Sequence, residues 1–247
     1  MKLAVITDLH ANREAVQAVL DHAQAQGAQR YAFLGDYVGY GADPGWVIDT
    51  VQRYVEAGAI AVGGNHDAGV ADATSPSMRA DARQVVDWTR GQLNPAQLDF
   101  LRRLPLTKVE GDVLFVHANA HEPSEWEYVL GRMEAVRSLH ATPCHYTFCG
   151  HVHEPKLFHL SQTGKAGDFL PTPGVEIPVP PHRQWLVIPG SAGQPRDGNP
   201  AACYALFDRE AQSLSFQRVP YDVELAGSKI LDAGLPARLA ERLRHGQ

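Results

Sequence analysis

The sequence has few cysteines, no long hydrophobic run and no excess of basic charge. Its three cysteines, Cys144, Cys149 and Cys203, are an odd number without a CxxC pair, which argues against a disulfide framework and against a cysteine zinc site. No stretch reaches the roughly 18 consecutive apolar residues of a membrane helix, and the first residues lack the apolar core of a signal peptide. We therefore expect a cytoplasmic protein that has no membrane partner.

The charge balance is also modest. With 28 acidic and 22 basic residues, a formal net charge of -6 and no run of Lys or Arg, the chain lacks the electrostatic pattern of proteins that grip long nucleic acids. Small anionic substrates remain compatible with this composition. At 247 residues, of which 44% are hydrophobic, we expect residues 1–247 to form a single domain. No coiled-coil pattern indicates an oligomeric state, which stays open.

Apolar runs of strand length alternate with helical patterns in the first part of the chain. The run 3–7 precedes a helical pattern over 13–26, and the run 31–34 precedes one over 44–56. Repeated strand-then-helix units predict a sheet with parallel strands, whose following loops share one edge. Further helices are predicted at 79–90, 95–103, 132–139, 223–232 and 236–244.

The second half is richer in strands. A hairpin is predicted where 106–110 and 113–116 flank Gly111-Asp112. The segment Ser161–Arg183 holds five prolines and three glycines, which predicts a surface loop or flap that either caps a crevice or is simply variable surface. The strands are too numerous for one narrow sheet, so we expect an α/β fold of two packed mixed sheets flanked by helices. The other strands are predicted at 59–62, 145–148, 156–160, 185–188, 202–207 and 214–219.

Five short polar signatures each follow a predicted strand. If these strands end at one edge, two aspartates, an asparagine and several imidazoles gather in a single crevice. Any one of these residues alone is more simply a turn, cap or loop residue, and the signal lies in the set. The signatures are Asp8-Leu9-His10, Gly35-Asp36, Gly64-Asn65-His66-Asp67, Val116-His117 and Gly150-His151-Val152-His153.

Such a set suits transition metals. Oxygen and imidazole ligands without thiolates favour manganese, iron or zinc, and the number of imidazoles argues against magnesium or calcium alone. There are enough ligands for two divalent ions. With one bridging carboxylate, ions about 3.5–4 Å apart can share a hydroxide and clamp the oxygens of a phosphoryl displacement.

The five signatures match the pattern DxH, GD, GNH(D/E), H and GHxH in that order. The sequence therefore resembles the calcineurin-like metallophosphoesterase superfamily of hydrolases, from residue 3 to about residue 220. Through Gly39–Pro44 and Pro189–Arg196 it is similar to a bacterial and archaeal group of phosphodiesterases and diadenosine tetraphosphatase-like proteins. The resemblance implies a four-layer αββα sandwich with two metal ions per chain.

The resemblance also implies roles for individual residues. The first metal ligands are then Asp8, His10, Asp36 and His153, and the second set is Asp36, Asn65, His117 and His151, with Asp36 as the bridge. A metal-bridging hydroxide is the implied nucleophile. His66 faces the leaving group, where an imidazole can protonate the departing alkoxide. We group Asp67 with His66 as a catalytic-site residue that positions His66 or a loop amide.

One departure from the superfamily bears on the substrate. Its serine/threonine protein phosphatases have GDxVDRG, whereas this chain has Gly39 and Tyr40 in place of the Asp and Arg. Arg196, after a Gly-Ser-Ala-Gly turn, can supply a substitute positive charge, so Arg196 and Tyr40 are the predicted substrate contacts. The leading hypothesis is a phosphodiesterase or nucleotide phosphohydrolase that acts on a small phosphate ester or nucleotide. The alternatives are a phosphomonoesterase, including a protein phosphatase, and a non-catalytic scaffold.

Overall fold

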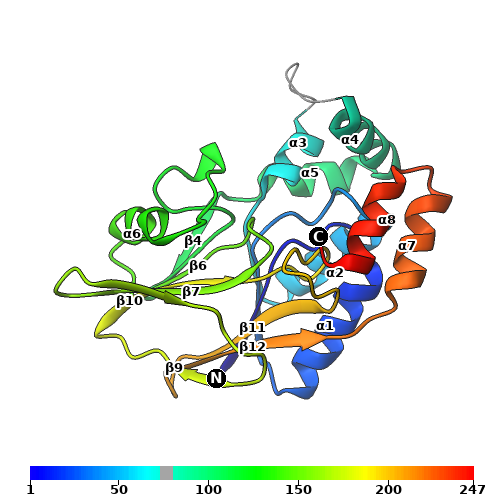
Figure 1. The fold of residues 1–247 in the computed structure, drawn as a ribbon. Coiled ribbons are helices and arrows are strands. Elements are labelled where there is room, and N and C mark those ends of the chain that lie inside the picture. The colour runs from blue at the N-terminus through cyan, green and yellow to red at the C-terminus, as the bar shows by residue number, and fades with distance from the viewer. Residues whose placement is uncertain (73–79) are drawn as a thin grey trace.

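Two six-stranded sheets form the centre of the molecule (Figure 1). The structure is a computed structural model that describes residues 1–72 and 80–247, residues 80–82 by their backbone alone. In spatial order, the first sheet contains β3 (Ile60–Ala61), β2 (Arg30–Phe33), β1 (Lys2–Ile6), β11 (Ala202–Asp208), β12 (Ser213–Val219) and β9 (Glu176–Pro178). The second contains β4 (Thr107–Glu110), β5 (Val113–Val116), β6 (Tyr146–Phe148), β10 (Arg183–Pro189), β7 (Pro155–Ser161) and β8 (Ala166–Phe169).

Both sheets are mixed. In the first sheet β1, β2 and β3 are parallel, and the other strands are antiparallel. In the second sheet β5, β6 and β10 are parallel, with antiparallel strands on either side. Each sheet therefore contains a group of parallel strands whose carboxyl ends lie at one edge, which is where polar loops can converge.

Helices cover the outer faces of the sandwich. Figure 1 shows α1, α2, α7 and α8 on the side of the first sheet and α6 on the side of the second. The described helices are α1 (Arg13–Ala25), α2 (Pro44–Glu56), α3 (Asn65–Ala71), α4 (Ala80–Gln92), α5 (Pro95–Arg103), α6 (Arg132–His140), α7 (Val223–Asp232) and α8 (Ala237–His245).

The alternation of side chains along the strands builds three hydrophobic layers. In β1, Ala4 and Ile6 join the cluster formed with α1 and α2, whereas Val5 joins the cluster between the sheets. A third cluster packs Leu139 of α6 against Leu186 of β10. Because both faces of each sheet are covered, most side chains in the middle of the central strands are buried and apolar. This arrangement confirms the predicted α/β fold with two mixed sheets flanked by helices.

Local sequence signals explain several helix boundaries. The Asn94 side chain accepts a hydrogen bond from the Gln97 amide, and the Gln97 side chain accepts one from the Asn94 amide, so α5 begins in a capping box. Pro95 follows at the first helical position. In α1 the Asn12 side chain accepts from the amide of Ala15. Most predicted elements agree with the structure within one or two residues.

Two expectations need correction. The GNHD signature is not a loop, because Asn65 opens the short helix α3. The segment Ser161–Arg183 is not simply a loop or flap, because it contributes β8 and β9, one edge strand to each sheet. Proline is tolerated in edge strands because an N–H group that faces away from the sheet makes no hydrogen bond to a neighbouring strand. β9 pairs with the beginning of β12, where Ser213 lies opposite Asp208 of β11. Asp208 in turn lies opposite Lys2, the first residue of β1, so β9 lies level with the start of β1 and away from its carboxyl end.

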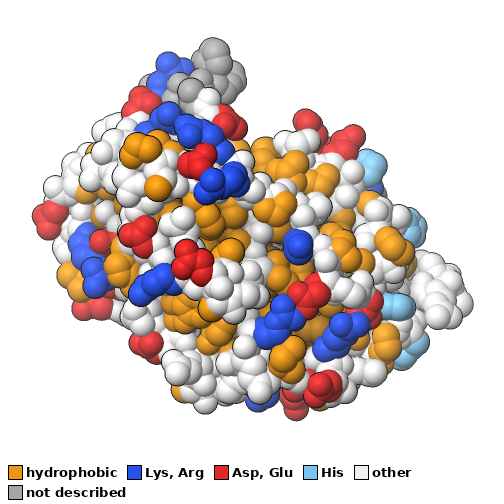
Figure 2. All heavy atoms as spheres, turned by 180° about the vertical axis from the view of Figure 1, so that it is seen from behind, with side chains coloured by type: hydrophobic (Ala, Val, Ile, Leu, Met, Phe, Trp, Pro, Cys, Tyr) orange, Lys and Arg blue, Asp and Glu red, His pale blue; other side chains and the backbone are white. Residues whose placement is uncertain are grey.

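The surface carries charges of both signs. On the face of the molecule seen in Figure 2, basic and acidic side chains are intermixed among hydrophobic ones. Among the helices of the described residues, none combines the length and apolar character needed to cross a bilayer.

The aromatic core between the sheets generates a stability prediction. Phe207 is 2% exposed, and its ring centroid lies 4.8 Å from that of Tyr146 and 5.4 Å from that of Phe148. Phe207→Ala should lower the free energy of unfolding by about 3–5 kcal/mol, because it removes buried area and leaves a cavity. Phe169→Ala, at an edge position that is 39% exposed, is the matched control and should change it far less. Urea denaturation measures both, and equal losses would contradict this account of the core.

Candidate metal centre

Seven polar side chains meet where parallel strands of both sheets end. Asp8 and His10 follow β1, Asp36 follows β2, Asn65 opens α3, His117 follows β5, and His151 and His153 follow β6. The six aspartates and histidines of this set are buried. The crevice predicted from the signatures therefore lies between the edges of two sheets, not at the edge of one.

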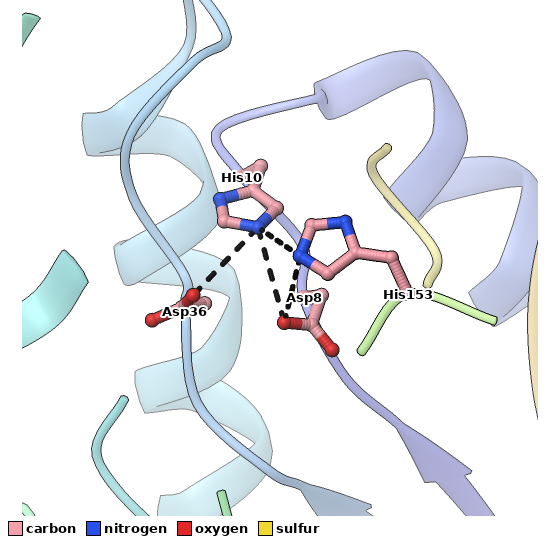
Figure 3. A group of neighbouring side chains, drawn as sticks. All are labelled: Asp8, His10, Asp36 and His153. Carbon is pink, nitrogen blue, oxygen red and sulfur yellow. Dashed lines mark hydrogen bonds and ion pairs between the residues drawn. The ribbon is translucent and has the colours of Figure 1, made fainter. Parts of the chain in front are cut away.

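The first group of side chains comprises Asp8, His10, Asp36 and His153, which point toward one another in Figure 3. His153 Nε2 lies 3.2 Å from Asp8 Oδ1 and 3.1 Å from His10 Nε2. His10 Nε2 lies 3.7 Å from Asp36 Oδ2. Four buried ligand atoms that lie this close together could hold one metal ion.

The second group shares Asp36 with the first. Asp36 Oδ2 lies 3.4 Å from His117 Nε2, which in turn lies 3.2 Å from His151 Nδ1. Asn65 Oδ1 lies 3.1 Å from the same His117 nitrogen. Asp36, His117 and His151 could hold a second ion. Since one oxygen of Asp36 faces an imidazole of each group, this carboxylate joins the two.

Backbone carbonyls fix which nitrogen of three histidines is free. Nδ1 of each ring donates to a carbonyl oxygen, so in the neutral ring Nε2 carries a lone pair and no proton. The pairs are His10 with Val38 at 3.1 Å, His117 with Leu34 at 2.7 Å, and His153 with Gln194 at 2.6 Å. A ring oriented in this way presents a ligand atom to the centre.

The free nitrogens then face one another. His10 Nε2 and His153 Nε2 lie 3.1 Å apart, each with its proton committed to Nδ1, so two lone pairs meet in the interior. A cation between them removes this repulsion and is coordinated by both. The donor set and its orientation therefore fit a metal ion.

The buried carboxylates of the site favour positive charge beside them. Burial alone raises the pKa of Asp36, but the imidazoles of His117 and His66 hold it well below its usual value. Burial lowers the pKa of His117, yet the Asp36 carboxylate raises it to about 9. For His151, burial and the neighbouring His117 lower the pKa to about 4. The buried carboxylates thus call for compensating charge, which a proton or a metal cation can supply.

The backbone around the site is held in an uncommon conformation. Of the nine non-glycine residues with positive φ in the described part of the chain, eight belong to the crevice and its rim, and Gln212 is the exception. The eight are Asp8, His10, Ala11, Asp36, Tyr40, Trp126, His151 and His153. Such conformations are costly for residues with a side chain and cluster at functional sites.

Glycines permit the loops to approach this closely. A Cβ at Gly64 would collide with the Asp36 side chain and lie 2.5 Å from its backbone nitrogen. A Cβ at Gly150 would collide with Thr7 and lie 2.6 Å from Asp8 Oδ2. The glycines of GNHD and GHVH therefore bring the second sheet and α3 against the carboxylates that follow β1 and β2.

The carboxyl group of Asp67 is hydrogen-bonded to the backbone. Its carboxyl accepts hydrogen bonds from the amides of Asp36 at 2.8 Å, Tyr37 at 2.9 Å and Gly64 at 2.9 Å. Burial and the Asp36 carboxylate raise the pKa of Asp67 to about 7. This agrees with one of the two roles expected for it, the positioning of loop amides.

His66 lies beside the centre and is half-buried. Its backbone N–H donates to Asp36 Oδ1 at 2.9 Å, and its ring centroid lies 5.0 Å from that of His10. A Cβ at Gly39 would lie 2.5 Å from His66 Nδ1. The His66 ring therefore occupies the space that a side chain at position 39 would need. The centroid of the Tyr40 ring lies 4.5 Å from that of the His66 ring.

Tyr40 and Arg196, the predicted substrate contacts, lie together beside this centre. The Tyr40 ring is 4.5 Å from His10, and the Arg196 guanidinium carbon is 5.7 Å from the centroid of Tyr40. Arg196 Nη2 also donates to Gln194 Oε1 at 2.9 Å. The structure therefore brings every residue predicted from the sequence to one place.

Two aromatic residues of the site were not predicted. The ring of Trp126 lies 5.9 Å from that of His117, and Tyr128 stacks on His151 at 4.0 Å with an interplanar angle of 16°. In the sequence, the only signal is a pair of aromatic residues, two positions apart, in the polar segment between β5 and α6.

Comparison with known proteins agrees with this geometry. Residues 1–212 match the calcineurin-like phosphoesterase superfamily domain. The chain is 34% identical over 251 residues to the uncharacterized protein MJ0912 of Methanocaldococcus jannaschii, covering 99% of this chain and 98% of that protein.

Solved structures share the fold over the whole chain. A metallophosphoesterase from Sphaerobacter thermophilus superposes with a TM-score of 0.88 at 33% identity, with 100% of both chains covered. Hypothetical protein PH1004 from Pyrococcus horikoshii OT3 superposes with a TM-score of 0.80 at 19% identity, covering 100% of this chain and 98% of that one, and so shares the fold. The five ordered signatures, the sandwich and these matches agree: the chain belongs to the calcineurin-like phosphoesterase superfamily.

Proposed function

We propose that this protein is a phosphoester hydrolase that depends on two divalent metal ions and acts on phosphodiesters or small nucleotides. The observation that carries the proposal is the shared carboxylate. Asp36 Oδ2 lies 3.7 Å from His10 Nε2 and 3.4 Å from His117 Nε2, so one side chain serves both groups that could hold an ion. Manganese, iron and zinc all suit these ligands.

Each side chain of the two groups has a place in this proposal. When bound, two such ions generate a nucleophile from water at neutral pH and neutralise charge on the phosphoryl oxygens. Asp36 belongs to both ligand sets. The first set also contains Asp8, His10 and His153, and the second also contains Asn65, His117 and His151.

His66 and Arg196 act on the substrate. We assign protonation of the leaving alkoxide to His66, whose ring borders the centre without a hydrogen bond to a proposed ligand among those described. Burial lowers the pKa of His66, while the Asp36 carboxylate opposes this effect. Arg196, held by Gln194 and by the face of Tyr40, supplies one positive charge for a phosphoryl oxygen.

The substrate preference follows from that single charge. A phosphodiester carries one negative charge and a phosphomonoester carries up to two. Gly39 and Tyr40 occupy the positions at which the protein phosphatases of the superfamily carry Asp and Arg, and the Arg196 charge balances that of a diester. We therefore favour a phosphodiesterase over a phosphomonoesterase.

Metal content and ester preference test the proposal directly. The purified protein, dialysed against Mn²⁺, should contain close to two ions per chain by elemental analysis. It should then hydrolyse bis-p-nitrophenyl phosphate with a higher kcat/KM than p-nitrophenyl phosphate. A preference for the monoester would point to a phosphomonoesterase, and a protein without stoichiometric metal or turnover would point to the scaffold alternative.

Two substitutions separate the role of a ligand from that of an acid. Asp36→Asn should remove most activity and weaken both metal sites, because its carboxylate serves both. His66→Ala should retain the metals and lower kcat by about 10²–10⁴-fold, as expected for the loss of general acid catalysis. His140→Ala, at an exposed position of α6, is the control and should behave like the wild type. A His66→Ala protein that loses its metals would refute this division of roles.

A third substitution tests the positioning role of Asp67. Asp67→Asn turns one acceptor atom into a donor that faces backbone N–H groups, which should lower the free energy of unfolding by about 1–3 kcal/mol. Mn²⁺ affinity should fall as well, since Asp67 holds the backbone amide of Asp36 itself. Asp72→Asn, at the exposed end of the same helix, is the matched control. Urea unfolding and calorimetric titration give the two readouts, and unchanged Mn²⁺ affinity would contradict the role.

A further inference from the structure

Two aromatic side chains form a surface directly beside the second group of proposed ligands. Tyr128 stacks on the ring of His151 with centroids 4.0 Å apart and planes 16° apart. Trp126 meets the ring of His117 edge-on at 5.9 Å. Both aromatic residues therefore lie one ring away from the place where a phosphoryl group would bind.

The conformation of the loop holds these rings in place. The buried side chain of Asn119 accepts hydrogen bonds from the amides of His121 and Glu122, both at 2.9 Å, and donates to the carbonyl of Glu127 at 3.1 Å. Within this framework Trp126 adopts a left-handed conformation with φ of 55°. A bulky residue takes this conformation only where its surroundings impose it.

Tyr128 is only partly covered by its neighbours. His151 covers one face of its ring, yet the residue is 45% exposed. A tyrosine that served only to support His151 would gain stability from further burial, because aromatic side chains stabilise through the area they remove from water. The exposed part of Tyr128 and the neighbouring indole are thus available to a flat group that extends from the crevice.

We infer that this site takes phosphate esters that carry a flat aromatic group, and that Trp126 and Tyr128 bind this group by stacking. The inference deepens the proposed function and rests on it, because the phosphoryl end must bind at the metal centre. Stacking on aromatic side chains depends little on which base or aryl ring is presented. The class of substrate is therefore a nucleotide or aryl phosphoester, and the two rings determine specificity and are not catalytic residues.

Three phosphonates that differ only in the attached group provide the test. Phenylphosphonate is flat and aromatic, cyclohexylphosphonate has a similar size without an aromatic face, and methylphosphonate carries the common head group. Their Kd values are measured by titration calorimetry on the Mn²⁺-loaded protein, at a pH where all three are dianions. Phenylphosphonate should bind about tenfold more tightly than cyclohexylphosphonate, as a single stacked ring predicts.

Variants assign the preference to the two rings. Tyr128→Leu and Trp126→Leu should each bring the ratio of the cyclohexyl to the phenyl Kd toward one, whereas Tyr128→Phe should retain it because the ring remains. Phe169→Leu, which changes a half-exposed aromatic residue on β8, is the matched control and should leave the ratio unchanged. The metal content of every variant is measured alongside.

The outcomes separate this inference from the proposed function. If none of the phosphonates binds the loaded protein, the phosphoryl site itself is refuted. If the phenyl and cyclohexyl compounds bind equally to the wild type, only the aromatic preference is refuted. If the leucine variants lose affinity for all three by the same factor, Trp126 and Tyr128 support the metal ligands and bind no substrate, which also overturns the inference.

Discussion

Two carboxylates buried between the sheets impose the constraint on which the site depends. Asp8 and Asp36 are 0% and 1% exposed, and an ionised group in that environment requires compensating charge and hydrogen bonds. Asp8 accepts from the Thr7 hydroxyl at 2.8 Å and from the His151 amide at 3.0 Å. Asp36 accepts from the His66 amide at 2.9 Å. The remaining oxygens face imidazoles. The two carboxylates therefore contact residues that follow strands of both sheets, and their charge favours a cation beside them.

This constraint extends into the backbone. The loops reach the carboxylates only in left-handed conformations, which cost of order 1–3 kcal/mol each for residues such as Asp36 and His153. Three features offset this cost: the hydrogen bonds that Asp67 accepts from backbone amides, the carbonyls that orient the imidazoles, and the apolar core between the sheets. The stability of the sandwich and the geometry of the centre are therefore linked. The strands and their core hold the loops in conformations that the loops alone would not keep.

The sequence predicts the parts of the molecule that local chemistry controls. The helix Pro44–Glu56 begins and ends as expected, because a proline at its first turn and helical spacing define it, and the ligands were found because polar residues follow apolar strands. The helix α3 was missed because its seven residues bury few apolar side chains. β8 and β9 were missed because edge strands tolerate the prolines and glycines that normally break strands. Trp126 and Tyr128 could not be found, because their place depends on hydrogen bonds of Asn119 to residues farther along the loop.

The loop after β10 couples the first ligand group to the charge that we assign to substrate binding. The carbonyl of Gln194 accepts from His153 Nδ1 at 2.6 Å and so orients that imidazole, while the Gln194 side chain accepts from Arg196 at 2.9 Å. The Arg196 amide in turn donates to the His153 carbonyl at 3.1 Å. One short segment thus fixes both a proposed ligand and the guanidinium over Tyr40. In the protein phosphatases the corresponding arginine belongs to the GD signature itself, whereas here the guanidinium comes from the loop after β10 and lies beside Tyr40, the residue at that signature position.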